Sequence, residues 1–213
     1  YVTDLYDPRI TVVDSRTNRI RGHIQTNGHK STEQMVQWGD EVFVNCWSYD
    51  NKLLVIDTRT ERLVDSISVG RQPSSLVIDR SGRLWTLTDG LNEPAILYRI
   101  DAATRRIERT FDFPAGDHPA RLALNGRRDT LYFINGGVWR MRIDAERLPH
   151  APFLPYAGTI YYGLGIDPAT SEVYVADAID YVQHGVVYRF TPQGRALDTL
   201  RVGIVPGSFC FKP

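Results

Sequence analysis

The stretch Leu54-Val-Ile-Asp57-Thr-Arg-Thr60 decides the fold, because similar stretches recur along the whole chain at a nearly constant spacing. In four copies the aspartates stand at positions 14, 57, 101 and 144, so the steps between them are 43, 44 and 43 residues. A fifth, degenerate copy follows 47 residues after the fourth and has a threonine at this position. Such self-similarity is typical of folds built from one repeated unit. The other copies are Ile10-Thr-Val-Val-Asp14-Ser-Arg-Thr17, Tyr98-Arg-Ile-Asp101-Ala-Ala-Thr104, Trp139-Arg-Met-Arg-Ile-Asp144 and Val187-Tyr-Arg-Phe-Thr191-Pro-Gln-Gly194.

Each repeat contains four short runs of β-branched and aromatic residues, separated by Gly, Asp, Asn and Pro. In the second repeat we expect strands at 33–38, 42–47, 52–56 and 62–67. The Asp side chain of the Asp-x-x-Thr turn can accept the backbone amide two residues on, which fixes a tight turn between the last two strands. We see no helical apolar stripe of useful length. Four antiparallel strands in about 40 to 50 residues form one blade of a β-propeller, so the sequence predicts an all-β propeller.

The strand count divides a single propeller domain, residues 1–213, into five modules. Residues 1–4 match the second strand of a blade, and residues 208–211, near the end of the chain, match the first strand of a blade. Two arrangements fit: a closed five-bladed ring in which the tail completes the first blade, and a larger ring with further N-terminal blades. Because the first residue is Tyr1 and not Met, we expect a segment upstream of it. The modules are 1–27 plus 207–213, 28–73, 74–120, 121–160 and 161–206.

Charge and cysteine usage exclude several classes of partner. The chain has 25 basic and 25 acidic residues and a pI near 7.1, so it lacks the basic excess that nucleic acid or an anionic membrane attracts. No apolar run approaches the roughly 18 residues of a membrane span. The two cysteines, Cys46 and Cys210, are too few for a disulfide framework, and we interpret both as small buried apolar residues, with a disulfide between them as the open alternative.

The candidate ligand-binding residues come from loops that a propeller gathers on one face. These loops join the second strand of a blade to the third, or one blade to the next. Aromatic rings beside amides and carboxylates suit a large, partly polar small molecule, because the rings stack on flat parts and the polar groups bond the rim. The residues are Tyr6, Trp47, Tyr49, Asp89, Asn92, His118, Asn135, Tyr162, Asp177, Asp180, Tyr181 and His184.

Some aromatic residues also have a packing interpretation. Trp47 and Tyr49 have an alternative role in packing between blades. For Trp38, Trp85 and Trp139, inside or beside strands, we predict a place in the core. We interpret the pair of aspartates at 177 and 180 as turn caps rather than cation ligands.

The sequence predicts no metal, no cofactor and no catalytic residues. None of the five histidines shows the spacing of a local metal motif. A site assembled from separate blades would draw on His29, His118 and His184. Nucleophile-elbow, phosphate-loop and dinucleotide signatures are missing from the sequence, and Cys46 has no histidine near it along the chain. We therefore expect a binding protein, with two alternatives: a scaffold for a protein or a glycan, and a metal-dependent propeller lyase or lactonase.

Several stretches resemble a known family. The opening Tyr1-Val-Thr-Asp4 and the segments 12–20 and 69–73 resemble the YVTN repeats of YncE-like propellers, which usually have seven or eight blades. Segments 28–35, 43–51 and 161–165 are similar to a Bacteroidetes surface-protein branch, which includes the BtuG-type lipoproteins that capture vitamin B12. This resemblance implies a corrinoid ligand, an outer-membrane transporter as partner, and a location at the cell surface or in the periplasm. It carries over no ligand-contacting residue.

Overall fold

The computed structural model describes residues 1–48, 50–156, 158 and 160–212. In these residues the chain forms strands and turns and no helix, which confirms the predicted all-β fold. The described residues therefore contain no helix that could span a membrane. The chain consists of two compact units, Tyr1–His118 and Pro119–Pro213, hereafter unit 1 and unit 2.

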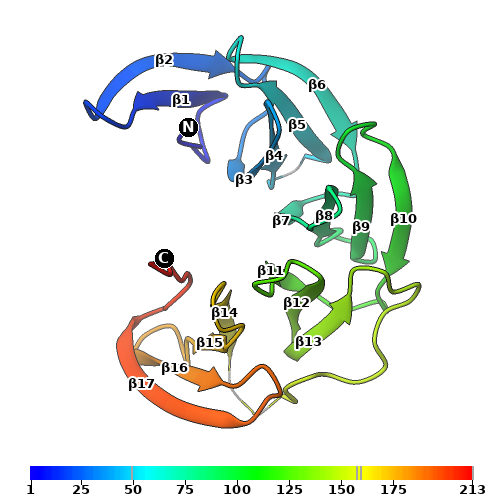
Figure 1. Cartoon of the computed structure of the whole chain (residues 1–213), viewed down its shortest axis with the longest axis vertical. Helices are drawn as coiled ribbons and strands as arrows, with labels where there is room; N and C mark the ends of the chain where they lie inside the picture. The colour runs from blue at the N-terminus through cyan, green and yellow to red at the C-terminus, as the bar shows by residue number, and fades with distance from the viewer. Residues whose placement is uncertain (49, 157, 159, 213) are drawn as a thin grey trace. The chain divides into compact units, whose positions relative to one another are not determined.

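Unit 1 contains two complete four-stranded blades and a smaller sheet (Figure 1). In every blade the strands follow chain order and neighbours are antiparallel, as the repeat predicts. The smaller sheet has two strands, and Val2 adds a single antiparallel bridge to Thr11. The strands are β1 (Arg9–Asp14), β2 (Arg19–Gln25), β3 (Thr32–Trp38), β4 (Glu41–Cys46), β5 (Lys52–Asp57), β6 (Arg62–Ser68), β7 (Pro73–Ile78), β8 (Arg83–Thr88), β9 (Ile96–Asp101) and β10 (Ile107–Asp112).

Unit 2 contains one four-stranded blade and one sheet of three strands. The strands are β11 (Ala120–Leu124), β12 (Thr130–Asn135), β13 (Gly137–Arg142), β14 (Tyr161–Ile166), β15 (Val173–Asp177), β16 (His184–Phe190) and β17 (Ala196–Ile204).

The expectation of four strands in every repeat is wrong for the module at 121–160. Within its described residues, only Leu154 bridges the edge strand β13, at Val138. The segment that follows β13 contains Pro149, Pro152 and Pro155. Proline has no amide hydrogen to donate to a strand ladder, so this segment does not form a regular fourth strand.

The Asp-x-x-Thr turns form as predicted. Asp57 Oδ1 accepts the amides of Arg59 at 2.8 Å and Thr60 at 2.9 Å. These bonds lower the pKa of Asp57, and the bond from Thr60 has the largest effect. The turns that begin at Asp14 and Asp101 bond in the same way. The residue after each Thr adopts the left-handed conformation that ends the turn; these residues are Asn18, Glu61 and Arg105.

The degenerate repeats close their turns differently. Thr191 replaces the aspartate in the fifth copy, and its hydroxyl accepts the amides of Gln193 and Arg195. Asp144, in the fourth copy, instead pairs with Arg142, with Nε–Oδ1 at 3.0 Å. A hydroxyl is the weaker form of the same local bond, so the turn survives the substitution.

The core lies between blades, because the middle strands are buried on both faces. Side chains alternate along β4 and β5. Phe43 and Val55 pack in a cluster with Leu84 and Ile100 of the third blade. Val44, one residue after Phe43 along the strand, points the other way, into a cluster with β1 and β2. The middle strands β4 and β5 thus join the second blade to both of its neighbours within unit 1, whereas the outermost strand β6 is largely exposed.

The predictions for single tryptophans and cysteines hold in part. Trp85 is fully buried, and its indole donates to Asp79 at 2.9 Å. The core prediction is wrong for Trp38, which is 38% exposed because it lies at the end of β3, over Gly82. Trp139 is partly buried and stacks on Phe133 at 6.4 Å.

Both cysteines lie in the described part of the chain and both are free. Cys46 is buried, as predicted. The same prediction is wrong for Cys210, which is exposed in the C-terminal tail. The described residues of this tail form no strand. Phe209 and Phe211 instead pack on Tyr174 of the same unit, at 5.9 and 5.3 Å. Pairing of the tail with the first module would be a contact between the units, and it stays a prediction.

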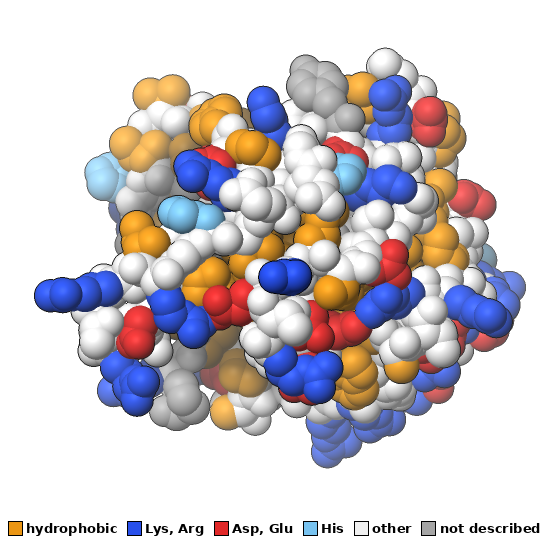
Figure 2. Space-filling model, turned by 90° about the horizontal axis from the view of Figure 1, so that it is seen from above, with side chains coloured by type: hydrophobic (Ala, Val, Ile, Leu, Met, Phe, Trp, Pro, Cys, Tyr) orange, Lys and Arg blue, Asp and Glu red, His pale blue; other side chains and the backbone are white. Residues whose placement is uncertain are grey.

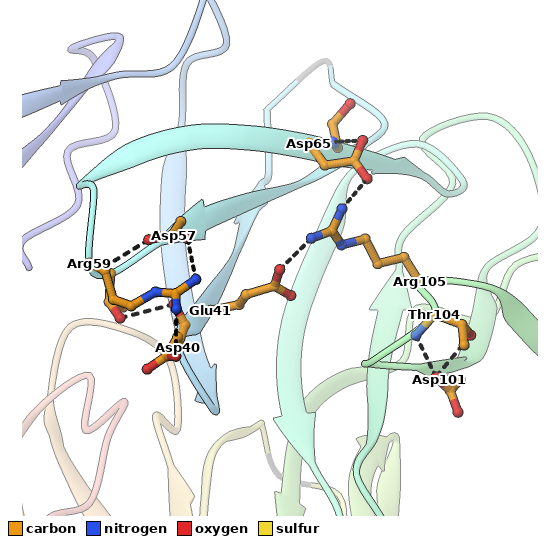
Figure 3. A network of polar contacts seen from close by, with 10 residues as sticks. Asp40, Glu41, Asp57, Arg59, Asp65, Asp101, Thr104 and Arg105 are labelled. Carbon is orange, nitrogen blue, oxygen red and sulfur yellow. Dashed lines mark hydrogen bonds and ion pairs between the residues drawn. The ribbon is translucent and has the colours of Figure 1, made fainter.

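An ionic network joins the second blade to the third (Figure 3). Arg105, at the turn between β9 and β10, donates to Asp65 on β6 at 2.7 Å and to Glu41 on β4. The hydrogen bond from Arg105 is the main reason that the pKa of Asp65 is lowered. Arg59 makes a similar but more exposed pair of contacts, to Asp57 and Asp40, within the second blade alone.

We expect the substitution Arg105→Met to lower the free energy of unfolding by about 1 kcal/mol, because it leaves the half-buried carboxylate of Glu41 and the exposed carboxylate of Asp65 without their cation. Arg59→Met is the matched control and should change stability little, since its side chain is 70% exposed. Urea unfolding of both variants measures the difference. Because the pKa of Asp65 is lowered in the folded state, the stabilisation is present above pH 3.8, the ordinary value, and is lost as the pH falls toward the lowered value. Equal effects of the two variants at neutral pH would contradict this assignment.

Candidate functional site

Two histidine–aspartate pairs lie at one end of the blades of unit 1. His29, between β2 and β3, places Nδ1 2.7 Å from Oδ2 of Asp50, which lies between β4 and β5. His118, which follows β10, places Nδ1 2.7 Å from Oδ1 of Asp89, which follows β8. All four come from the two kinds of loop that the sequence singled out.

The backbone of Gln72 connects the two pairs. Its amide donates to the carbonyl of Asp50 at 2.9 Å, and its carbonyl accepts from the amide of Asp89 at 3.0 Å. Gln72 is 7% exposed. It adopts a left-handed φ of 56°, and in this conformation its amide and its carbonyl make the two backbone bonds. Ser31, with φ 58°, links Leu5 to Trp47 in the same way one blade earlier. Backbone hydrogen bonds therefore join the loops of neighbouring blades at this end of unit 1.

Trp47 gives this end of unit 1 an exposed aromatic ring. It directly follows β4 and is 37% exposed, so it is not fully buried between blades. Tyr6 is 84% exposed and Asn92 is also exposed. Tyr49, the remaining candidate from these blades, lies outside the described residues. We use the name loop face for the following residues of unit 1: His29, Trp47, Asp50, Gln72, Asp89 and His118.

Cys46 lies against the first histidine–aspartate pair. One ligand atom from each of His29, Cys46 and Asp50 lies within 4.8 Å of the others. Burial, and to a lesser degree the Asp50 carboxylate, raises the pKa of the Cys46 thiol to about 12. A thiol of that pKa stays protonated at neutral pH and is a poor nucleophile. The raised pKa therefore argues against a catalytic cysteine at this position.

The sequence reasoning missed this cluster because His29 is far from Cys46 along the chain. The strand register would have shown it, since Cys46 pairs with Thr32 and His29 comes three residues before Thr32. Asp50 and Gln72 were also absent from the predicted set, although both lie in the loops from which that set came. The sequence feature that could have identified Asp50 and Gln72 is their position in the repeat, not their residue type.

Unit 2 carries a separate aromatic group. Tyr162 and Tyr181 meet edge to face at 5.6 Å, and the guanidinium of Arg121 lies 5.0 Å from the centre of the Tyr162 ring. Arg121 also donates through Nε to the Tyr162 carbonyl at 3.0 Å. Tyr181 is 49% exposed. The structure therefore brings together two of the predicted residues with an arginine that the sequence reasoning did not select.

The remaining predicted residues of unit 2 make local hydrogen bonds. Asp177 is 1% exposed and accepts the amides of Ile160 and Ile179. Asp180 caps a turn through the amides of Val182 and Gln183, which matches the turn-capping interpretation of both aspartates. The Asn135 carbonyl accepts the indole of Trp139, and His184 Nδ1 lies 3.0 Å from the Val202 carbonyl.

Charged side chains of both signs lie on the face drawn in Figure 2. Lysine and arginine side chains there lie among aspartate, glutamate, hydrophobic and uncharged polar side chains. This matches the balanced composition of the chain. A mixed surface of this kind gives no extended positive field that would attract a polyanion.

Comparison with known proteins supports the fold alone. No protein-family model matches the chain, and no curated protein matches it. Three of the similar solved structures are a Kuenenia stuttgartiensis hydrazine synthase (TM-score 0.75, 14% identity, 94% of this chain and 62% of that one), a quinonprotein alcohol dehydrogenase-like protein from Bacteroides thetaiotaomicron (0.70, 15%, 95% and 55%) and a Dos1 propeller (0.65, 12%, 90% and 54%).

The chain is a β-propeller. Its four-stranded antiparallel blades and its similarity to propeller structures agree on this. It spans only 62%, 55% and 54% of the three chains above, and at 12 to 15% identity no activity passes from them to this protein.

The two cysteines should differ sharply in reactivity. With Ellman's reagent near pH 8, in the presence of EDTA, we expect one thiol per folded chain to react rapidly. The exposed Cys210 is that thiol, whereas Cys46 is buried and burial raises the pKa of its thiol to about 12. The variant Cys210→Ser should remove the fast reaction, and guanidinium should release the second thiol. A fast reaction that persists in Cys210→Ser would show that Cys46 is accessible.

Proposed function

We propose that the protein binds a small molecule at the loop face of unit 1. The observation that carries this proposal is the pairing of His29 with Asp50 and of His118 with Asp89, two polar pairs joined through the backbone of Gln72, at the end of unit 1 that also exposes Trp47. Imidazoles and carboxylates that are already positioned can bond the polar rim of a ligand, and an indole can stack on a flat part of it. Exposed aromatic and polar side chains on rigidly held loops are common in binding sites.

The candidate ligand is a corrinoid. Such a molecule combines a broad, flat ring with a rim of amide groups, which fits the mixture of aromatic and polar side chains on the loop face. The resemblance of the sequence to YncE-like surface propellers of Bacteroidetes supports the same ligand. On this proposal the protein acts at the cell surface, as an outer-membrane lipoprotein, or in the periplasm, and passes the ligand to an outer-membrane transporter.

Two alternative functions, a scaffold and a metal-dependent enzyme, each have an observation in their favour. A protein or glycan scaffold is the alternative if small molecules fail to bind, and the exposed ring of Tyr181 beside Tyr162 gives such a partner a contact in unit 2. A metal-dependent lyase or lactonase is the other alternative, and the cluster of His29, Cys46 and Asp50 favours it.

The test is a titration of cyanocobalamin, followed by its visible absorbance and by quenching of tryptophan fluorescence. The 213-residue chain and the longer protein that contains it, if there is one, are titrated in parallel. We expect Trp47→Ala to weaken binding about tenfold, the loss expected for one stacked aromatic ring. Trp38→Ala is the matched control, because Trp38 is 38% exposed against 37% for Trp47 but lies at the opposite end of the β3–β4 hairpin.

The outcomes separate the parts of the proposal. Equal losses in the Trp47 and Trp38 variants would mean that the loop face is not the binding surface. Binding by the longer protein alone would show that residues outside this chain complete the site. An absence of binding in both would exclude the corrinoid.

A further inference from the structure

We propose that His29, Cys46 and Asp50 form a binding site for one divalent transition-metal ion, with zinc as the natural occupant. In the part of the chain that the structure describes, this is the one group of three or more potential ligands gathered closely enough to hold an ion. The inference assigns an ion to the same His29–Asp50 pair that the ligand-binding proposal uses, and metal binding is measured separately from ligand binding.

The distances are close to those of a metal site. Zinc holds nitrogen and oxygen ligands at about 2.0 to 2.2 Å and sulfur at about 2.3 Å, so the ligand atoms of a tetrahedral site lie about 3.3 to 3.6 Å apart. The three ligand atoms here lie within 4.8 Å of one another, and His29 Nδ1 is 2.7 Å from Asp50 Oδ2. An ion would spread the His29–Asp50 contact by about 0.6 Å and draw the sulfur in by up to about 1.2 Å. Small side-chain rotations supply movements of this size.

The donor set selects the kind of ion. A thiolate, an imidazole and a carboxylate together suit zinc and its neighbours in the first transition row, whereas calcium and magnesium require oxygen ligands. When the metal binds, the Cys46 thiol releases its proton to solvent, and the neutral His29 ring keeps its one proton on the nitrogen that does not bind the ion. Three protein ligands leave a fourth position for water, and the cluster is open on one side, because the His29 and Asp50 side chains are 29% and 17% exposed.

The surroundings already orient the ligands. Asp50 Oδ1 accepts the amide of Asn51 at 2.7 Å, which leaves Oδ2 facing His29. The Asp50 carbonyl is held by the amide of Gln72, and the His29 carbonyl accepts the hydroxyl of Thr26. Cys46 ends β4 and is anchored in the core between the first and second blades. Such outer contacts are a regular feature of metal sites, since they fix the direction of each ligand.

The second histidine–aspartate pair provides a matched control inside the same unit. His118 and Asp89 have the same 2.7 Å contact. The strand position that corresponds to Cys46 is occupied there by Thr88, since Thr88 pairs with Pro73 as Cys46 pairs with Thr32. Their side chains are also more exposed, at 68% and 35%. This pair lacks the sulfur ligand, so it should not hold the ion.

The experiment uses the full chain with Cys210→Ser as background, so that Cys46 is its one thiol. Cobalt(II) is titrated in as a spectroscopic substitute for zinc, and zinc binding is measured by equilibrium dialysis. We expect one ion per chain, visible bands of tetrahedral cobalt, and a near-ultraviolet thiolate-to-cobalt band that zinc displaces. His29→Ala, Asp50→Asn and Cys46→Ala should each abolish the one-to-one complex. His118→Ala and Asp89→Asn should leave it unchanged.

Two further measurements keep the result decisive if a variant unfolds. Circular dichroism establishes that each variant is folded, and X-ray absorption of the zinc-loaded background protein counts sulfur ligands without any change at the site. One sulfur neighbour supports the proposal. No stoichiometric ion in the folded background protein, a complex without a sulfur neighbour, or loss of binding in His118→Ala equal to that in His29→Ala would overturn it.

Discussion

Burial of both faces of the middle strands is the constraint on which the rest of the structure depends. In β4 and β5 successive side chains point to opposite faces, and both faces are covered by apolar residues of neighbouring sheets within unit 1. Fully buried side chains such as Phe43 and Leu53 each contribute about 1.5 to 3 kcal/mol through burial. A single blade cannot cover both of its own faces, so the blades must stack. The sequence repeats because each repeat forms one blade of this stack.

The loop face follows from this stacking. Once β4 and β8 are fixed in neighbouring blades, the residues that follow them emerge at the same end of unit 1. The left-handed turn at Gln72 then bonds the backbone of Asp50 to that of Asp89. Several side chains in these loops, such as Trp47 and His118, are exposed and are therefore available for binding. Cys46 is the exception, because it belongs both to the core and to the cluster with His29 and Asp50.

The ionic network around Arg105 shows how the turns add to the stacking. The Asp101 turn places Arg105 in a left-handed conformation, and from there its side chain reaches two carboxylates of the preceding blade. The same kind of contact joins Arg21, which follows the turn between β1 and β2, to Glu61 of the second blade. One local turn therefore serves both to reverse the chain and to align neighbouring sheets.

The sequence by itself determined the repeat, the strands and the turns, because each depends on residues close together along the chain. The period of about 43 residues and the Asp-x-x-Thr signal were sufficient to predict four-stranded blades. The three prolines that follow β13 are also visible in the sequence, but the expectation of a fourth strand in the module at 121–160 did not take them into account. Exposure at the ends of elements was harder to predict, as Trp38 and Cys210 show, since it depends on what covers a residue from elsewhere in the fold.

Only the tertiary structure decided which side chains meet. His29 and Cys46 are 17 positions apart, His118 and Asp89 are 29 apart, and no local spacing links them. Their encounter depends on strand register and on the backbone bonds at Ser31 and Gln72, which place loops of neighbouring sheets side by side. Sequence patterns report short-range geometry, whereas a site made from several loops exists only after the blades have stacked.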